Sequence, residues 1–308
     1  MAWRKIGLVF DRSKYELDWI NSHAMLPTPL VMEDCIRVYY SPRDVNGKSR
    51  ITYVDLDKDD PAKVLYVHKE PVLSLGKLGA CDDSGTLCTC ALECDGKIYL
   101  YYTAYNIRVT VPYGNAIGLA VSDDGGNSFT RLFDGPVLDR SAYDPYFVIS
   151  PWVMKFGEGW RMWYAAGTKW ITVDGKPESL YQIKTAFSQD AINWCKDDLT
   201  CIPTMSEYEA NAKPTVVFED GMYKMWFCYR GSNDFRDGPE SYRIGYATSE
   251  DGLSWIRSDA ECGIQPGPQE WDSKMQAYPS VVSTKSSKYL FYNGNGFGMN
   301  GFCCAVWE

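Results

Sequence analysis

Three carboxylates recur at one distance from prolines in apolar, strand-like runs. Asp144, Glu207 and Asp272 each lie seven residues before such a proline, and Glu209 lies two residues beyond Glu207. The prolines are Pro151, Pro214 and Pro279. Cleavage of a glycosidic bond commonly uses one carboxylic acid to protonate the leaving oxygen and one carboxylate to activate water or attack carbon. Crowding of like charges raises one pKa and so creates the acid. If the fold brings these side chains together, they are candidates for this chemistry.

Two further segments lead into comparable runs and carry other groups able to move protons. Asp82 and Asp83 precede one run, and His23 precedes another that has no carboxylate. Histidine is a competent general acid or base near neutral pH. The alternative is structural, because such acids can be solvated or cap strands and a lone histidine can be buried and hydrogen-bonded. The candidate catalytic residues are Glu209, Glu207, Asp144, Asp83, Asp272 and His23.

Cationic and aromatic side chains complete a candidate binding pocket. Lysine and arginine could hold an anionic sugar, a phosphate or a nucleotide-sugar through charge-assisted hydrogen bonds, while tryptophan could stack on a sugar ring. The alternatives are surface salt bridges and packing between sheets. The segment 293–298 is rich in glycine but follows no strand–helix pattern, so it is not expected to be a phosphate loop. The candidate substrate-binding residues are Asp82, Arg108, Tyr113, Trp170, Lys213, Arg230, Trp271 and Asn293.

A repeat of about sixty residues must position these groups. Its clearest member is an aromatic-rich run in which the matching residues are spaced by 62, 62, 63 and 65 positions. These residues are Tyr39, Tyr101, Trp163, Trp226 and Phe291. A proline-containing run precedes each one, and a run rich in small residues and a shorter fourth run follow in most units. Such short runs, bounded by Gly, Asp and Asn, are typical of strands and turns.

Four antiparallel strands repeated five times predict an all-β, five-bladed β-propeller. The last unit ends at its third strand, so we expect the N-terminal run 3–10 to supply the fourth and close the ring, leaving no open edge. The prediction is one domain, residues 1–308. Three turns combine Ser-x-Asp with a following Phe or Trp, and their aspartates, Asp124, Asp190 and Asp251, are expected to be scaffold rather than catalytic.

Composition narrows the classes of partner. The chain has 308 residues and a formal net charge of −9, which argues against nucleic acid because such binders need a clustered basic face. No apolar run is long enough to suggest a membrane-spanning helix. The 11 cysteines lack the paired spacing of a metal site, and several lie in apolar runs as expected for free, buried thiols. Free thiols, and an N-terminus without a signal-peptide pattern, favour the cytoplasm.

The sequence resembles the five-bladed propeller glycosidases of glycoside hydrolase families 43, 32, 62 and 130, through its repeat plan and its YDPYF and EYEANAKPTV segments. The Ser-x-Asp turns resemble the Asp-box hairpins of sialidases and other glycan-processing propellers. The segments GMYKMWFCYRG, YRIGYATSEDGLSW and LFYNGNGFG are most similar to glycosyl hydrolase-like proteins of bacterial surface-polysaccharide gene clusters. That group is related to a propeller region of plant glucosamine inositolphosphorylceramide transferases.

The resemblance implies roles for particular residues. In the classical families a first-blade Asp is base or nucleophile, a third-blade Asp orients or tunes, and a fourth-blade Glu is the acid. By position Asp144 matches the tuning Asp, and Glu209 or Glu207 matches the acid. The first blade departs from the pattern because it carries His23. Either Asp82, Asp83 or Asp272 substitutes as base, or His23 transfers the proton, or the chain does not hydrolyse.

The leading hypothesis is therefore a carbohydrate-active enzyme of glycoside hydrolase type, with carboxylates in the central funnel. One alternative is a non-catalytic glycan-binding propeller in polysaccharide biosynthesis, and another is a transferase-type enzyme that uses a nucleotide-activated sugar. The expected partner is a carbohydrate or sugar conjugate. No cofactor or metal is predicted, and the oligomeric state, the sugar and the stereochemical outcome are left open.

Overall fold

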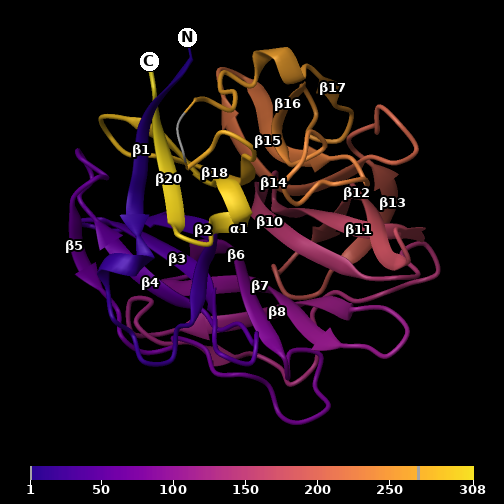
Figure 1. Cartoon of the computed structure of the whole chain (residues 1–308), viewed down its shortest axis with the longest axis horizontal. Helices are drawn as coiled ribbons and strands as arrows, with labels where there is room; N and C mark the ends of the chain where they lie inside the picture. Colours follow the sequence, from indigo (N-terminus) through magenta and orange to yellow (C-terminus); the bar gives the residue numbers. More distant parts are fainter. Residues whose placement is uncertain (1, 269–270) are drawn as a thin grey trace.

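The computed structural model describes residues 2–268 and 271–308, whose strands form five four-stranded antiparallel sheets arranged as blades in a ring (Figure 1). The first blade comprises β2 (Ser22–Val31), β3 (Ile36–Arg43), β4 (Thr52–Leu56) and β5 (Val64–Val67). The second comprises β6 (Gly85–Cys94), β7 (Lys97–Ile107), β8 (Tyr113–Ser122) and β9 (Thr130–Arg131). The third comprises β10 (Val148–Phe156), β11 (Gly159–Val173), β12 (Lys176–Ser188) and β13 (Cys195–Thr200). The fourth comprises β14 (Ala210–Glu219), β15 (Met222–Arg230), β16 (Arg243–Ser249) and β17 (Ile256–Arg257).

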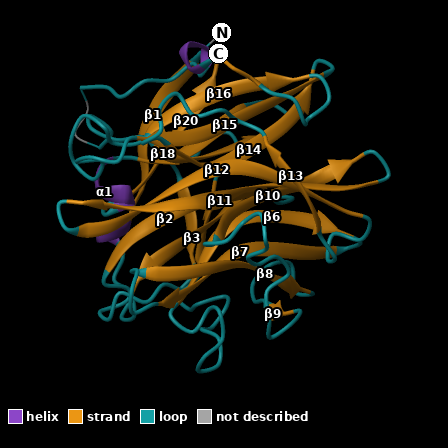
Figure 2. Ribbon diagram, turned by 90° about the vertical axis from the view of Figure 1, so that its right-hand side faces the viewer, coloured by secondary structure: helices purple, strands orange, loops and turns teal. Residues whose placement is uncertain are grey.

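The fifth blade joins the two ends of the chain, which confirms the predicted ring closure. It comprises β18 (Ala277–Ser283), β19 (Lys288–Asn293), β20 (Gly301–Trp307) and β1 (Trp3–Asp11). Backbone hydrogen bonds between Ala2 and Glu308 extend this pairing to the chain ends, which lie side by side (Figure 1). The helical segments are only η1 (Arg12–Lys14), η2 (Asp259–Glu261) and α1 (Asn295–Gly298) in the described chain, so strands dominate Figure 2. None of these helices is long and apolar enough to cross a membrane.

The repeated aromatic residues lie on the second strand of each blade and fill the space between neighbouring blades. All five are buried, and Tyr39 and Trp163 pack edge-on against aromatic rings of the following blades, Phe129 and Trp255. In the four that carry an indole or hydroxyl group, that group also donates to a backbone carbonyl, as in Trp163 Nε1 to Gly252 O at 3.1 Å. Because an aromatic side chain buries about 150–250 Å², these residues supply much of the cohesion between blades. The period read from the sequence is therefore the period of the blades.

The first strands surround the axis, and each one contains an irregularity at the same level. Near the centre of Figure 1 lie β2, β6, β10, β14 and β18. Each changes register against its second strand, β2 at two points and the other four strands at one, where a β-bulge is formed. In four blades the bulge contains a residue with positive φ directly before a proline; these residues are Leu26, Ser150, Lys213 and Tyr278. The bulge therefore sets which side chains reach the mouth of the axial channel.

The Ser-x-Asp turns form hydrogen-bonded loops at the ends of third strands, as the sequence pattern predicts. In one of them, backbone N–H groups of Ser254 and Leu253 donate to Asp251, and the hydroxyl of Ser249 donates to the same carboxylate. These bonds lower the pKa of Asp251 to about 2. The aspartate is thus a structural acceptor that stays ionised and shapes the turn.

Candidate functional site

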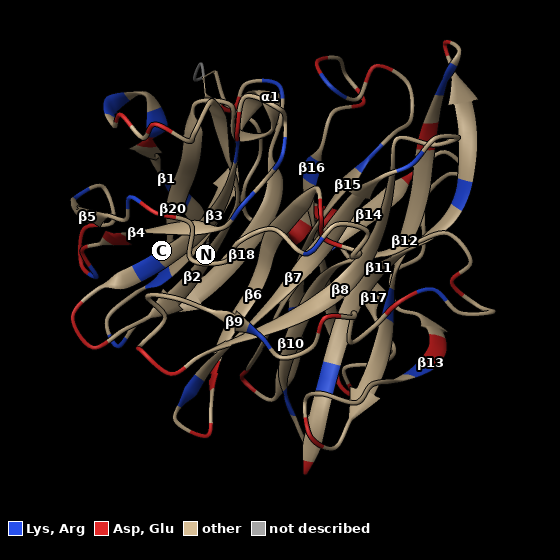
Figure 3. Cartoon of the chain, turned by 90° about the horizontal axis from the view of Figure 1, so that it is seen from below, with Lys and Arg blue, Asp and Glu red and all other residues tan. Residues whose placement is uncertain are grey.

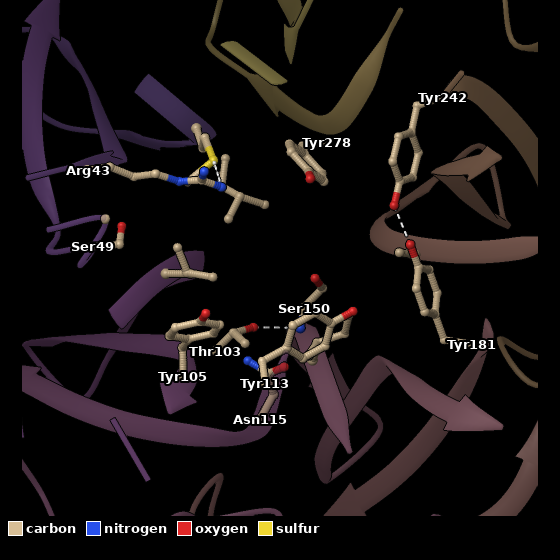
Figure 4. A pocket seen from close by; sticks show the side chains of 16 residues that line it. Arg43, Ser49, Thr103, Tyr105, Tyr113, Asn115, Ser150, Tyr181, Tyr242 and Tyr278 are labelled. Carbon is tan, nitrogen blue, oxygen red and sulfur yellow. Dashed lines mark hydrogen bonds between the residues drawn. The ribbon is translucent and has the colours of Figure 1, made fainter. Parts of the chain in front are cut away.

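A pocket of about 330 Å³ opens at one mouth of the axis and is lined by 16 residues (Figure 4). All five first strands contribute to it, so the ring as a whole builds its walls. Its lining includes Leu26, Ser150 and Tyr278, three of the residues that precede strand prolines. The volume lies at the lower end of the range for small-ligand pockets. We call this cavity the axial pocket.

Five tyrosines line the axial pocket, and two of them are held by a buried arginine. The hydroxyls of Tyr181 and Tyr242 are hydrogen-bonded to each other (Figure 4), and Arg230 Nε donates to them at 3.1 and 3.3 Å. The Arg230 guanidinium is 3.8 Å from the ring centre of Phe235, and the residue is only 3% exposed. Burial raises the pKa of Tyr242 well above its ordinary value, so this hydroxyl remains protonated at neutral pH. Arg230 thus lies behind the pocket wall as a positioning residue and does not line the pocket itself.

The pocket is also lined by other polar residues and by one charged residue. Tyr113 exchanges a 2.7 Å hydrogen bond with Ser179, and Asn115 donates to the carbonyl of Ala104 at 3.1 Å. Burial raises the pKa of Tyr113 to about 12. Arg43 lies across the pocket from the Tyr181–Tyr242 pair (Figure 4), and its guanidinium contacts the sulfur of Met25 at 3.5 Å.

None of the 16 lining residues is Asp or Glu. Within the described residues no carboxylate forms an ion pair with Arg43, so the pocket carries an uncompensated positive charge. A pair of acids facing one cavity, which glycoside hydrolysis commonly requires, is therefore not found in the axial pocket. The arrangement offers aromatic faces, neutral hydroxyl groups and one guanidinium.

Asp144 instead lies inside the third blade, where it is 1% exposed. Its carboxylate contacts Lys196 Nζ at 2.6 Å and Lys184 Nζ at 3.0 Å, and accepts the hydroxyl proton of Tyr164 at 3.0 Å. Burial alone would raise the pKa of Asp144, but hydrogen bonds and charge from the two lysines outweigh it and hold the pKa below its ordinary value.

The same arrangement recurs in other blades. Asp82 accepts from Tyr102 at 2.9 Å, and its ion pair is with Arg131. Asp272 accepts from Tyr292 at 3.0 Å, and its ion pair with Lys5 is 2.5 Å long. In the fourth blade Glu209 is bound by Arg257 at 2.5 Å. In each cluster one cation comes from the fourth strand, namely Arg131, Lys196, Arg257 or Lys5, and the third blade adds Lys184 from its third strand. We call these groups the blade clusters. The acids of the blade clusters do not line the axial pocket. A catalytic role for them stays a prediction, and their burial against cations does not support it.

The other catalytic candidates also lie away from the axial pocket. Asp83 accepts from the N–H of Gly79 and the hydroxyl of Ser84 in the turn before β6. Glu207 is exposed in the turn before β14. His23 is hydrogen-bonded to Ser22 at 2.8 Å, and burial followed by the charges of two nearby arginines lowers its pKa to about 4. The imidazole is therefore neutral at pH 7.

Lys213 and Asn293 are fully buried and hold the scaffold. Lys213 Nζ donates to Ser280 Oγ at 3.0 Å, and burial lowers the pKa of Lys213 to about 8. Asn293 accepts from the N–H of Leu26 at 2.8 Å and donates to carbonyls of the first and fifth blades. Trp271 packs against the core between the fourth and fifth blades. None of the three lines the axial pocket.

Three predicted binding residues do meet, in a second cavity of about 320 Å³. Arg108, Tyr113 and Trp170 line it, and the ring centres of Tyr113 and Trp170 are 5.2 Å apart. Tyr113 and Asn115 line the axial pocket as well, so the two cavities share a wall. We call the second cavity the side pocket.

Sequence reasoning missed most of the axial pocket, including Arg43, Tyr181, Tyr242 and Tyr278. One signal was available for Tyr278, because it directly precedes a strand proline, as Leu26 and Ser150 do. A second signal identifies the blade clusters: three of the acids lie 20 positions before the tyrosine that binds them.

Two proteins of Mycobacterium tuberculosis are 40% identical to this chain over 310 residues, covering 100% of this chain and 100% of each relative. They are uncharacterized protein MT1551 of strain CDC 1551 / Oshkosh and uncharacterized protein Rv1502 of strain ATCC 25618 / H37Rv. This chain belongs to their family. No family model matches the sequence.

Solved structures similar to this member of the Rv1502 family include glycoside hydrolases. One, described as a glycoside hydrolase, has a TM-score of 0.76 and 15% identity, covering 99% of this chain and 91% of that chain. A thermostable family-43 glycoside hydrolase has a TM-score of 0.68 and 17% identity, covering 95% and 91%. A third structure represents the GH130 family of mannoside phosphorylases. That family contains glycoside hydrolases that target beta-1,2 mannosidic linkages in Candida mannan. The TM-score of this third structure is 0.67 and its identity 17%, over 98% and 89%. The predicted resemblance to propeller glycosidases is confirmed at the level of the fold.

Proposed function

We propose that this protein binds a carbohydrate in the axial pocket and does not cleave it by the two-carboxylate mechanism. The observation that carries the proposal is the lining: five tyrosines and Arg43, without Asp or Glu among the 16 residues. Tyrosine suits a sugar because its ring covers the apolar C–H face while its hydroxyl reaches the sugar hydroxyls. The glycoside hydrolase fold of the structural neighbours is consistent with a sugar ligand and leaves the chemistry open.

The absence of acids from the axial pocket weighs against hydrolysis. General acid catalysis needs a proton donor within hydrogen-bond reach of the leaving oxygen. The tyrosines Tyr113 and Tyr242 keep their protons because burial raises their pKa values, so they are poor nucleophiles at neutral pH. Their hydroxyls can donate and accept hydrogen bonds, which is what recognition of a sugar requires.

A glycan array followed by calorimetry and product analysis tests the proposal. We expect the wild-type protein to bind a subset of glycans and to leave them intact after long incubation, as measured by mass spectrometry. Tyr105→Ala should weaken binding about fivefold to tenfold, because Tyr105 lines the pocket and an aromatic contact contributes about 1–1.5 kcal/mol. The matched control is Tyr208→Ala, which removes a tyrosine that is half exposed outside the pocket.

Two outcomes contradict the proposal. If no glycan binds, or if Tyr105→Ala and Tyr208→Ala bind equally well, the axial pocket is not a sugar site. If a sugar is released and a folded Glu209→Gln variant abolishes that release, the two-carboxylate hypothesis is correct instead.

A further inference from the structure

The side pocket lies next to the axial pocket, between the second and third blades. The two cavities share Tyr113 and Asn115, and their volumes are similar, about 330 and 320 Å³. A ligand that occupies both cavities has to pass Tyr113 and Asn115, which line each of them. In the side pocket it meets Trp170, whose ring packs at 56° to that of Tyr113, and Tyr146, which is 41% exposed.

The side pocket carries positive charge. Arg108 and Arg140 line it, and none of its lining residues is Asp or Glu. Within the described chain, the ion pair of Arg140 is a 4.0 Å contact with its neighbour Asp139, and Arg108 Nε donates to the neutral side chain of Asn106 at 3.2 Å. Both guanidinium groups thus retain donors for a ligand.

This positive region is notable because the protein as a whole is acidic. The chain has 40 acidic and 31 basic residues, and Figure 3 shows both kinds spread over the loops and strand ends. The two neighbouring cavities are lined by three arginines, Arg43, Arg108 and Arg140, and by no Asp or Glu. Guanidinium groups bind carboxylate and phosphate through short, charge-assisted hydrogen bonds.

We propose that the side pocket is a second subsite and takes an acidic sugar unit, bearing a carboxylate or a phosphate, of a glycan whose neighbouring unit fills the axial pocket. This inference rests on the proposed function and names its ligand class. Trp170 supplies the aromatic surface for the second unit, and Arg108 and Arg140 bind its anionic group. Tight binding then requires a glycan of at least two sugar units that carries a negative charge.

Calorimetry with three sets of probes tests the inference: oligogalacturonides of one to four units, neutral cello-oligosaccharides of the same lengths, and phosphorylated oligosaccharides from a glycan array. We expect acidic chains of two or more units to bind at least tenfold more tightly than neutral chains or single units. Preference for the carboxylate or the phosphate probes identifies the anionic group.

Arg108→Gln combined with Arg140→Gln should weaken binding of acidic chains at least tenfold, because each arginine contributes charge-assisted contacts. Both residues are exposed, so folding should be unaffected. The matched control combines Arg4→Gln with Lys77→Gln, which removes two exposed cations whose ion pairs lie elsewhere.

The outcomes separate the two proposals. If glycans bind but neutral chains bind as well as acidic ones, or the paired arginine variant behaves like its control, the second subsite is refuted while the axial pocket remains a sugar site. Equal affinity for one unit and for two also refutes it. If no glycan binds the wild-type protein, the proposed function itself has failed.

Discussion

Asp144→Asn distinguishes a structural acid from a catalytic one. The substitution keeps the shape of the side chain and removes the negative charge that faces Lys184, Lys196 and Tyr164 inside the third blade. If Asp144 were catalytic, the variant would lose turnover and keep its stability. If Asp144 belongs to the blade scaffold, the loss appears in the free energy of unfolding.

The magnitude follows from the contacts. Breaking a buried ion pair from one side costs about 3–5 kcal/mol, because the partner charge is left without compensation. Here the lysines keep other partners: Lys184 Nζ is 2.7 Å from Asp198, and Lys196 Nζ donates to the carbonyl of Asp139. We therefore expect a loss near the lower limit, about 3 kcal/mol.

Urea unfolding followed by tryptophan fluorescence measures this loss, with Glu207→Gln as a control that neutralises an exposed acid. The pKa of Asp144 is lowered in the folded state, so its contribution is complete above the pKa of the unfolded chain, about 3.9, and disappears as the pH falls through the lower folded value. The difference between wild type and variant should therefore shrink below about pH 4. A variant within 1 kcal/mol of wild type at pH 7 would refute the scaffold role.

Three further substitutions test the scaffold and the ring. Lys213→Met should remove a rise in stability with pH. The pKa of the buried Lys213 is about 8 in the folded protein and about 10.4 in the unfolded chain. The free energy of unfolding of wild type should therefore increase by roughly 3 kcal/mol relative to that of the variant between pH 7 and 11. Parallel denaturation curves check this, and a constant difference contradicts it. Asn293→Ala should cost about 2–4 kcal/mol because three buried hydrogen bonds of the ring closure are lost, and unchanged thermal stability would instead favour a ligand role. Trp226→Ala should cost about 3–5 kcal/mol, whereas Trp160→Ala, at a half-buried position, should cost less in the same unfolding assay.

The fold could be predicted because its physical cause is repeated in the sequence. One aromatic per blade, such as Tyr39 or Trp226, packs against the next blade, so the spacing of aromatics equals the spacing of blades. The closing strand could be predicted because the last unit lacked a fourth member. Both inferences need only a repeating pattern and the requirement that no sheet edge stays open.

The pocket could not be predicted in the same way, because the bulges displace its residues from the regular pattern. Counting seven residues back from each proline reaches Asp144 and Asp272, which fold into their blades. The side chain that lines the axial pocket is the one directly before the proline, as in Ser150 and Tyr278. The partner cation Arg131 lies on a strand of two residues, which has no recognisable alternation in the sequence.

Repetition itself argues that the acids of the blade clusters are structural. In the second, third, fourth and fifth blades the cation stands opposite an alanine of the third strand. The first blade has Val54 paired with Val67 instead, and the matching tyrosine, Tyr40, is buried without a hydrogen-bond partner for its hydroxyl in the described structure. A cluster that recurs in four of five blades has a role that the blades share, which is to hold the strands of each blade together.

A single ligand bound on the axis of a five-bladed ring has no such symmetry, so the groups that recognise it must differ from blade to blade. Three residues before the strand prolines fulfil this requirement: Leu26, Ser150 and Tyr278 line the axial pocket from one structural position with three different chemistries. Arg43 adds a charge from one side only. Positions that are equivalent in the repeat but differ in residue type between blades are therefore the better guide to function in this propeller. Such positions surround the axial pocket.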